Sequence, residues 1–228
     1  METQNFHPTD SRTVLIVLEQ GSISCYGLDA GIRWSLGREA TGNTPDIPLK
    51  SPVASRHHGE FVLVDDEWFY FDRGSLNGTL YNGKKIKGGI NGRINPIMLA
   101  NGDVLRIDRS VTSQSDPRGV WMLFSTENIP GEWAYFSLLG RSVVIMGRDA
   151  ERCGLVQPLP YVSAQHMKFT MREGKCWVAD CGSKAGTWLN GRQIEDAVPL
   201  REKDWVSIGD CHFVFTGTGL IYNDCSSI

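Results

Sequence analysis

Short runs of apolar, β-branched and aromatic residues, separated by turn residues, recur along the whole chain. Runs of this length and composition predict β-strands. No segment keeps an apolar period of 3.6 residues long enough to predict a helix of any size. In the first half the predicted strands are residues 13–18, 60–64, 68–72, 104–107 and 120–124, and the second half repeats the series. We therefore expect an all-β protein.

A motif of ten residues occurs twice. Residues 74–83 read Gly-Ser-Leu-Asn-Gly-Thr-Leu-Tyr-Asn-Gly, and residues 182–191, 108 positions later, read Gly-Ser-Lys-Ala-Gly-Thr-Trp-Leu-Asn-Gly. The same offset maps residues 55–58 onto 163–166, and an offset of 110 maps Gly37-Arg38 onto Gly147-Arg148. A repeat over this length indicates two homologous modules.

The expected domains are residues 1–127 and 128–228, because Ile129-Pro130-Gly131 interrupts the pattern between the copies. The first copy is longer, with loops inserted near residues 87–92 and 110–119 that are rich in turn-forming residues. Asn82-Gly83 and Asn190-Gly191 are typical of tight hairpin turns. Many short strands with glycine-rich turns predict a β-sandwich in each half, with any binding site on the loops at one end.

Composition narrows the function classes. Apolar residues make up 41% of the chain, charged residues 21%, and the net charge is −3, which gives no global field for nucleic acid or an acidic membrane. No stretch approaches the roughly 20 apolar residues of a membrane span, and the first ten residues do not resemble a signal peptide. We expect a cytoplasmic protein. The six cysteines are scattered without C-x-x-C pairs, so we expect reduced, buried thiols and no metal or cofactor.

An ordered set of motifs in the first copy resembles the signature of the forkhead-associated (FHA) domain. The set is Gly37-Arg38, then Ser55-Arg56-x-His58, then Gly-Ser-x-Asn77-Gly-Thr79, then Asn82-Gly83. The resemblance covers essentially the whole chain once both copies are counted. It implies two tandem FHA-type antiparallel β-sandwiches whose loops bind phosphothreonine peptides.

The residue types fit this ligand. A phosphothreonine carries about −1.5 to −2 charges and three strong acceptor oxygens, so its receptor needs converging cationic and hydroxyl donors. Arg38, Ser55 and Arg56 form such a set, and the planar fork of arginine can bond two phosphate oxygens at once. We expect the first module to act as a signalling adaptor for a phosphothreonine-containing protein, such as a Ser/Thr kinase or its substrate.

The resemblance assigns roles to the remaining motif residues. Asn77 would hydrogen-bond the main chain of the peptide beside the phosphothreonine. Gly37, His58 and Thr79 would support the site structurally. A metal site at His57-His58 is disfavoured, because no carboxylate or cysteine lies at ligand spacing.

The second copy departs from the signature at two positions. Arg148, Ser163, His166 and Thr187 are retained, whereas Ala164 stands in place of Arg56 and Ala185 in place of Asn77. We expect a degenerate site in a module that is structural or binds without phosphorylation. Lys184 or Arg152 could replace the missing cation from another direction, which leaves weak phosphate binding as the alternative.

One basic stretch in the first copy has two interpretations. The basic stretch of Lys84, Lys85, Lys87 and Arg93 either selects acidic residues beside the phosphothreonine or only aids solubility.

The chain has no P-loop, no Gly-x-Ser-x-Gly elbow and no His-Glu-x-x-His motif, so we expect no enzyme. The rival function is a phosphorylation-independent scaffold or dimerisation module.

Overall fold

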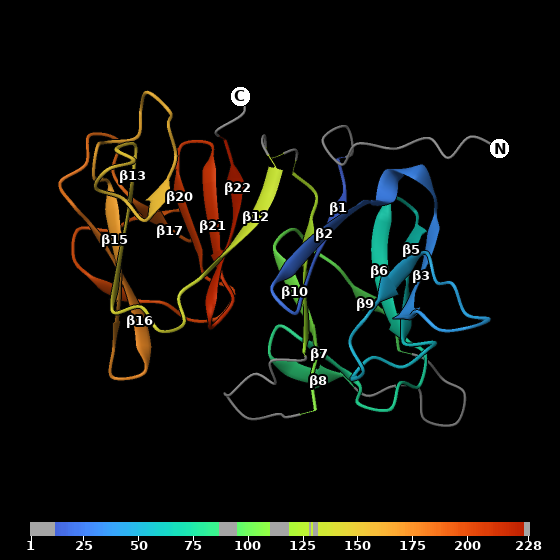
Figure 1. Ribbon diagram of the computed structural model, residues 1–228. Helices are drawn as coiled ribbons and strands as arrows, with labels where there is room; N and C mark the ends of the chain where they lie inside the picture. The colour runs from blue at the N-terminus through green and yellow to red at the C-terminus, as the bar shows by residue number, and fades with distance from the viewer. Residues whose placement is uncertain (1–11, 87–94, 110–118, 128, 130–131, 226–228) are drawn as a thin grey trace. The chain divides into compact units, whose positions relative to one another are not determined.

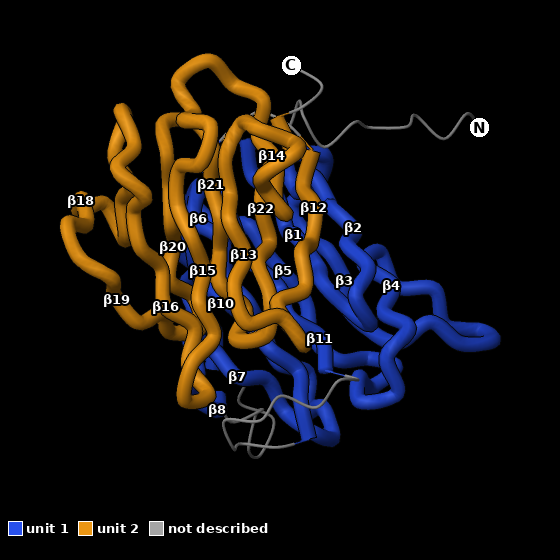
Figure 2. Tube along the Cα trace, turned by 60° about the vertical axis from the view of Figure 1, so that its left-hand side comes forward, with its two compact units in different colours: residues 1–128 blue, residues 129–228 orange. Residues whose placement is uncertain are grey.

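The computed structural model describes residues 12–86, 95–109, 119–127, 129 and 132–225. The chain divides into two compact units, residues 1–128 and 129–228, drawn in different colours in Figure 2. The described residues form eleven strands in each unit, arranged as two β-sandwiches, which confirms the all-β fold class. The predicted inserted loops, and Lys87 and Arg93 with them, fall largely outside the described ranges.

The first unit packs a six-stranded sheet of order β2-β1-β11-β10-β7-β8 with a five-stranded sheet of order β4-β3-β5-β6-β9 (Figure 1). Its strands are β1 (Val14–Glu19), β2 (Ser22–Gly27), β3 (Arg33–Arg38), β4 (Ile47–Leu49), β5 (Gly59–Val64), β6 (Glu67–Asp72), β7 (Thr79–Tyr81), β8 (Lys84–Ile86), β9 (Ile97–Met98), β10 (Asp103–Ile107) and β11 (Val120–Ser125). A single turn of 3-10 helix, Leu28–Ala30, joins β2 to β3.

The second unit has sheets of order β12-β22-β21-β20-β17-β18 and β14-β13-β15-β16-β19. Its strands are β12 (Glu132–Ser137), β13 (Val143–Gly147), β14 (Leu155–Val156), β15 (Met167–Arg172), β16 (Lys175–Asp180), β17 (Trp188–Leu189), β18 (Arg192–Gln193), β19 (Val198–Pro199), β20 (Trp205–Ile208), β21 (Cys211–Phe215) and β22 (Gly219–Asp224). Each unit contains one short parallel pair, β3 with β4 and β13 with β14, while the other pairs of the described strands are antiparallel.

Each sandwich encloses its own apolar core. In the first unit Phe61 and Tyr70 are fully buried, with ring centroids 5.1 Å apart. In the second unit Phe169, the counterpart of Phe61, and Phe213 are both fully buried, with ring centroids 6.5 Å apart. Burying an aromatic or branched side chain of this size contributes about 1.5–3 kcal/mol. These two cores hold the strands whose ends carry the loops described below.

The Asn-Gly dipeptides form hairpin turns as predicted. Asn82 and Gly83 have φ of 48° and 78° and link β7 to β8, and Asn190 and Gly191, with φ of 49° and 77°, link β17 to β18. Positive φ at both central residues is the requirement of a type I′ turn, which asparagine and glycine satisfy at little cost.

The cysteines only partly match the expectation of buried thiols. Cys176, Cys211 and Cys225 are buried, but Cys25 and Cys153 are half-buried and Cys181 is exposed. Cys181 directly follows β16, so it lies on a loop and not inside the core.

The second unit has the sheet order of the first, but its chain is circularly permuted. One edge of the larger sheet runs β2-β1-β11 in the first unit and β12-β22-β21 in the second. β12 therefore takes the place of β2, and the C-terminal strand β22 takes the place of β1. β1 precedes β2 along the chain, whereas β22 follows β21, so the two units supply the same strand from opposite ends.

Strand register and hydrogen bonds support this equivalence. Val14 pairs with Gly27 in the first unit, and Gly219 pairs with Ser137, 110 positions after Gly27, in the second. The backbone N–H of Leu28 donates to the carbonyl of Thr13 (2.8 Å), and the N–H of Leu138, also 110 positions on, donates to that of Thr218 (3.0 Å). The repeat offset does not extend to this strand, so comparing the two copies along the sequence did not predict the permutation.

Because β22 lies between β12 and β21, we predict that its apolar residues are essential to the second unit. Leu220 is fully buried, so Leu220→Ala should lower the free energy of unfolding of this unit by about 2–5 kcal/mol. Chemical denaturation measures the change. Leu139→Ala, the same truncation at a side chain that is 68% exposed, should have little effect. Equal stability of the two variants would show that β22 is dispensable.

Candidate functional site

The loops at one end of the first sandwich surround an open hollow of about 770 Å³. It is lined by Arg38, Pro52, Val53, Ala54, Ser55, Arg56, His57, Leu76, Asn77 and Arg109. The four residues predicted to bind the phosphopeptide, Arg38, Ser55, Arg56 and Asn77, are thus brought together, although they come from three separate segments of the chain. Arg38 ends β3, Ser55 and Arg56 lie between β4 and β5, and Asn77 lies between β6 and β7.

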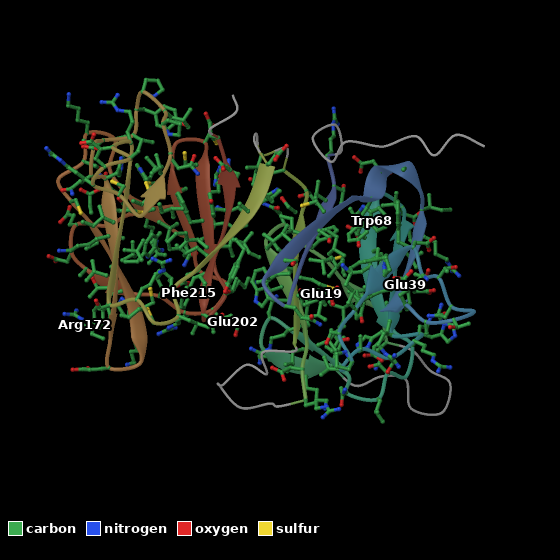
Figure 3. The ribbon with its side chains drawn as sticks, in the orientation of Figure 1. Glu19, Glu39, Trp68, Arg172, Glu202 and Phe215 are labelled. Carbon is green, nitrogen blue, oxygen red and sulfur yellow. The ribbon has the colours of Figure 1, made fainter. Side chains whose placement is uncertain are left out.

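The segment that carries Ser55 and Arg56 is anchored at its start by Glu19, at the end of β1 (Figure 3). The Glu19 carboxylate accepts hydrogen bonds from the backbone N–H groups of Lys50 and Ser51, each at 3.0 Å. Hydrogen bonds to a charged acceptor are among the stronger ones in proteins. The position of this segment therefore depends on a strand from the other sheet.

Two side-chain hydrogen bonds tie the binding loops to each other. The Ser55 hydroxyl accepts from the backbone N–H of Leu76 (2.9 Å), and the Asn77 amide nitrogen donates to the carbonyl of Val53 (2.7 Å). A carboxamide has two N–H donors and an oxygen that accepts through two lone pairs, so the bond to Val53 uses only one of the four possible hydrogen bonds of Asn77. The two loops are held as one surface.

Arg38 is half-buried and is oriented by the same loop, since its Nε donates to the carbonyl of Ala54 (3.2 Å). Gly37 allows the end of β3 to lie close to the loop that carries Arg56, because a Cβ at that position would lie 1.9 Å from the carbonyl oxygen of Arg56. Asn43 adds a further link, donating to the backbone carbonyls of both Arg38 and Arg56 at 2.9 Å.

His58 lies fully buried beneath the hollow. Its Nδ1 accepts from the backbone N–H of Ser55 (3.1 Å), and its Nε2 lies 3.3 Å from the Thr79 hydroxyl. A backbone N–H can only donate, so Nδ1 carries no proton and the neutral ring is protonated on Nε2. Thr79 donates in turn to Asp72 (3.0 Å), and its oxygen lies 2.8 Å from the Tyr70 hydroxyl.

Burial lowers the pKa of His58 from 6.5 to about 4, against the opposing effect of the Asp72 charge and a hydrogen bond with Gly78. The imidazole is therefore neutral at physiological pH, in the state that the bond from Ser55 requires. A charged ring would lose that acceptor. The geometry gives His58 and Thr79 a supporting position below the loops, with Gly37 as the point of close packing.

Sequence reasoning missed several residues of the hollow. Leu76 is 89% exposed and lines it beside Asn77. Arg109 follows the end of β10, about 50 positions after the Ser-Arg motif, and contributes a third arginine. Its position next to the motif residues depends on strand pairing, and no local pattern marks it. Lys84 and Lys85, the described part of the basic stretch, are exposed on β8 and do not line the hollow.

Comparison with known families identifies the family of both units. The family model described as "FHA domain" matches residues 34–108 and 144–209, which is more than half of the chain. The chain belongs to the FHA domain family. FHA domains are binding modules, so the chain is not an enzyme, and they typically bind phosphothreonine peptides. Both matches end before the last strands of their units, and the second leaves out the permuted strand β22.

The chain is similar to several curated proteins over part of its length. It is 37% identical to the glycogen accumulation regulator GarA of Mycobacterium tuberculosis over 87 residues, covering 36% of this chain and 49% of that protein. It is 38% identical to the oxoglutarate dehydrogenase inhibitor of Corynebacterium jeikeium over 87 residues, covering 36% and 55%. The chain thus spans about half the length of the curated relatives it matches.

Similar solved structures also belong to FHA proteins. The N-terminal FHA domain of EssC, from a bacterial type VII secretion apparatus, aligns over 94% of this chain and 93% of that chain, with 14% identity and a TM-score of 0.33. The second FHA domain of the Mycobacterium tuberculosis ABC transporter Rv1747 aligns over 40% and 82%, with 30% identity and a TM-score of 0.32.

The second FHA domain repeats most of the supporting frame of the first, although His166 Nε2 lies 3.2 Å from the Gly186 carbonyl oxygen and not next to the threonine hydroxyl. The Ser163 N–H donates to His166 Nδ1 (3.0 Å), the Ser163 hydroxyl accepts from the N–H of Lys184 (3.1 Å), and Thr187 donates to Asp180 (2.7 Å). Burial also lowers the pKa of His166. The frame is therefore independent of which residues line the site above it.

The side chains above that frame differ from those of the first FHA domain. Ala164 and Ala185 are exposed, and neither side chain has a hydrogen-bond donor. Arg152, one candidate for compensation, lies 3.4 Å from the Asp149 carboxylate, while Lys184 is exposed and bonded to Ser163 only through its backbone. Arg148 is exposed at the end of β13.

Among the described residues, no group of three or more His, Cys, Asp or Glu side chains is arranged to hold a metal ion. Within the same part of the chain, no helix is long and apolar enough to cross a bilayer.

We predict that the His58 imidazole has a pKa near 4 in the folded protein, measurable by NMR titration of its ring carbons. The unfolded chain has the ordinary value of about 6.5, so between pH 6.5 and 4 the unfolded state binds more protons. The stability of the first FHA domain should therefore fall as the pH drops through this window and return above it. A folded-state pKa at or above 6.5 would contradict the neutral, buried ring.

Proposed function

We propose that the first FHA domain binds phosphothreonine proteins through Arg38, Ser55, Arg56 and Asn77, and that the chain acts as a signalling adaptor. The observation that carries this proposal is the convergence of these side chains on one open hollow, on loops fixed from below by His58. In this proposal Arg38, Ser55 and Arg56 hold the phosphate, and Asn77 holds the peptide main chain.

The strength of binding follows from the number of contacts. Hydrogen bonds to charged groups each contribute about 1.5–3 kcal/mol, and association itself costs several kcal/mol. Three or four such bonds leave a modest affinity that depends strongly on the phosphate. Leu76, exposed at the edge of the hollow, adds apolar contact for a residue next to the phosphothreonine.

The proposed partner is a protein phosphorylated on threonine, either a Ser/Thr kinase or a kinase substrate. Two relatives are named as a regulator of glycogen accumulation and an inhibitor of oxoglutarate dehydrogenase. Both names describe control of other proteins or processes, which fits an adaptor that acts by binding. We include a cytoplasmic location in the proposal.

For the second FHA domain we propose a structural role or binding that does not need phosphorylation. Ala164 and Ala185 remove a phosphate contact and a peptide contact while the frame of Ser163, His166 and Thr187 persists. The loss of two such contacts amounts to several kcal/mol, most of a modest affinity.

The first test is the dependence of binding on Arg56. Arg56→Ala should weaken binding to a phosphothreonine peptide library by at least about tenfold, because it removes a charge-assisted contact to the phosphate. Isothermal titration of the intact protein measures the affinity, with the unphosphorylated library as control. Binding that ignores both the phosphate and Arg56→Ala would favour the phosphorylation-independent scaffold.

The second test is stoichiometry. If only the first FHA domain binds phosphothreonine, calorimetry should give one phosphopeptide per chain, and Arg148→Ala should leave the affinity unchanged. Arg148 is the counterpart of Arg38, so the two alanine variants form a matched pair. Two bound peptides per chain, or loss of one site in Arg148→Ala, would refute a degenerate second pocket.

A further inference from the structure

The hollow of the first FHA domain has a surplus of positive charge. Its lining includes Arg38, Arg56 and Arg109, and among the described residues that line it none is acidic. A phosphothreonine brings about −1.5 to −2 charges, which two guanidinium groups already balance. Arg109 adds a third, so the hollow suits a ligand with more negative charge than one phosphate supplies.

Arg109 and Asn77 line the same hollow. β10 pairs with β7 in antiparallel register, with Leu105 opposite Tyr81 and Arg106 opposite Leu80. Arg109 follows β10 and Asn77 precedes β7, so the antiparallel pairing places both at the same end of these two strands. Since Asn77 is the residue proposed to hold the peptide main chain, Arg109 lies where the residues next to the phosphothreonine would pass.

The second FHA domain has the opposite charge at this position. β20 pairs with β17 so that Ser207 lies opposite Trp188, the counterpart of Leu80. Ser207 therefore corresponds to Arg106, and three residues on, Asp210 corresponds to Arg109. Asp210 is exposed in the short turn between β20 and β21. The domain without the phosphate contacts thus also carries a carboxylate where the first carries a guanidinium.

We propose that Arg109 is a specificity-determining residue that selects phosphothreonine peptides with a second anionic group close to the phosphothreonine. This rests on the proposed function of the first FHA domain. The second group is a carboxylate side chain or a second phosphate, since both accept hydrogen bonds from a guanidinium. Arg109 is exposed, so its contribution is moderate and sensitive to salt.

The experiment compares three sets of peptides with the intact protein by calorimetry or fluorescence anisotropy. The parent is a phosphothreonine peptide with neutral flanking residues. In the second set one aspartate is placed in turn at each flanking position, and in the third set a second phosphothreonine is scanned in the same way. The variants are Arg109→Gln and the control Arg33→Gln.

Arg33→Gln is a suitable control because this substitution removes the same charge at a distance from the hollow. It begins β3, whose other end carries Arg38, and five residues of strand span about 17 Å. Its side chain is 64% exposed. Both substitutions therefore change the net charge equally, and only one alters the hollow.

The expected result is that the wild-type protein binds at least one peptide with a second anionic group about three- to fivefold more tightly than the parent, as one additional exposed ion pair allows. Arg109→Gln should remove this preference and keep the parent affinity within about twofold. Arg33→Gln should keep the preference. The aspartate and phosphate sets show which of the two groups is selected.

Other results would overturn the proposal. A preference that persists in Arg109→Gln would assign it to other residues. An equal loss for every phosphopeptide in Arg109→Gln would make Arg109 a contact to the phosphothreonine itself. If the parent binds but no second anion improves its affinity, the selectivity is absent while the proposed function stands. Failure of every phosphopeptide to bind the wild-type protein would remove both.

Discussion

The loop surface proposed to bind phosphothreonine in the first FHA domain depends on one buried hydrogen bond, from the backbone N–H of Ser55 to Nδ1 of His58. It requires a neutral imidazole, which burial provides by lowering the pKa of the ring. Thr79 and Asp72 continue the chain of bonds into the core, and the side chains of His58, Thr79 and Asp72 each have a hydrogen-bond partner there. Leaving such a group unpaired costs about 1–3 kcal/mol, so the loops above it have one favoured arrangement.

In the second FHA domain a similar frame lies beneath different side chains. The bond from Ser163 to His166 is kept, although the residues above it no longer offer a guanidinium from position 164 or an amide from position 185. The charge at the position of Arg109 changes in the same direction, from arginine to aspartate.

Circular permutation leaves this frame intact. β22 fills the place of β1 although it comes from the other end of the repeat, because the sheet requires only a strand of the correct direction and register. The hydrogen bonds that join this strand to the loop after the short parallel strand pair also differ between the two domains. In the first FHA domain Glu19 accepts from that loop, and in the second the Gln157 side chain bonds the backbone at Asn223 and Cys225.

The sequence by itself determined the two modules, the hairpins at Asn82-Gly83 and Asn190-Gly191, and the loop residues Arg38, Ser55, Arg56 and Asn77, because turn chemistry and short motifs are local properties. Tertiary structure decided what depends on pairing between distant strands. Arg109 reaches the hollow through the register of β10 with β7, and β22 completes a sheet through its pairing with β12. Neither contact leaves a pattern in neighbouring residues, since the pairing partners are separated by tens of positions along the chain.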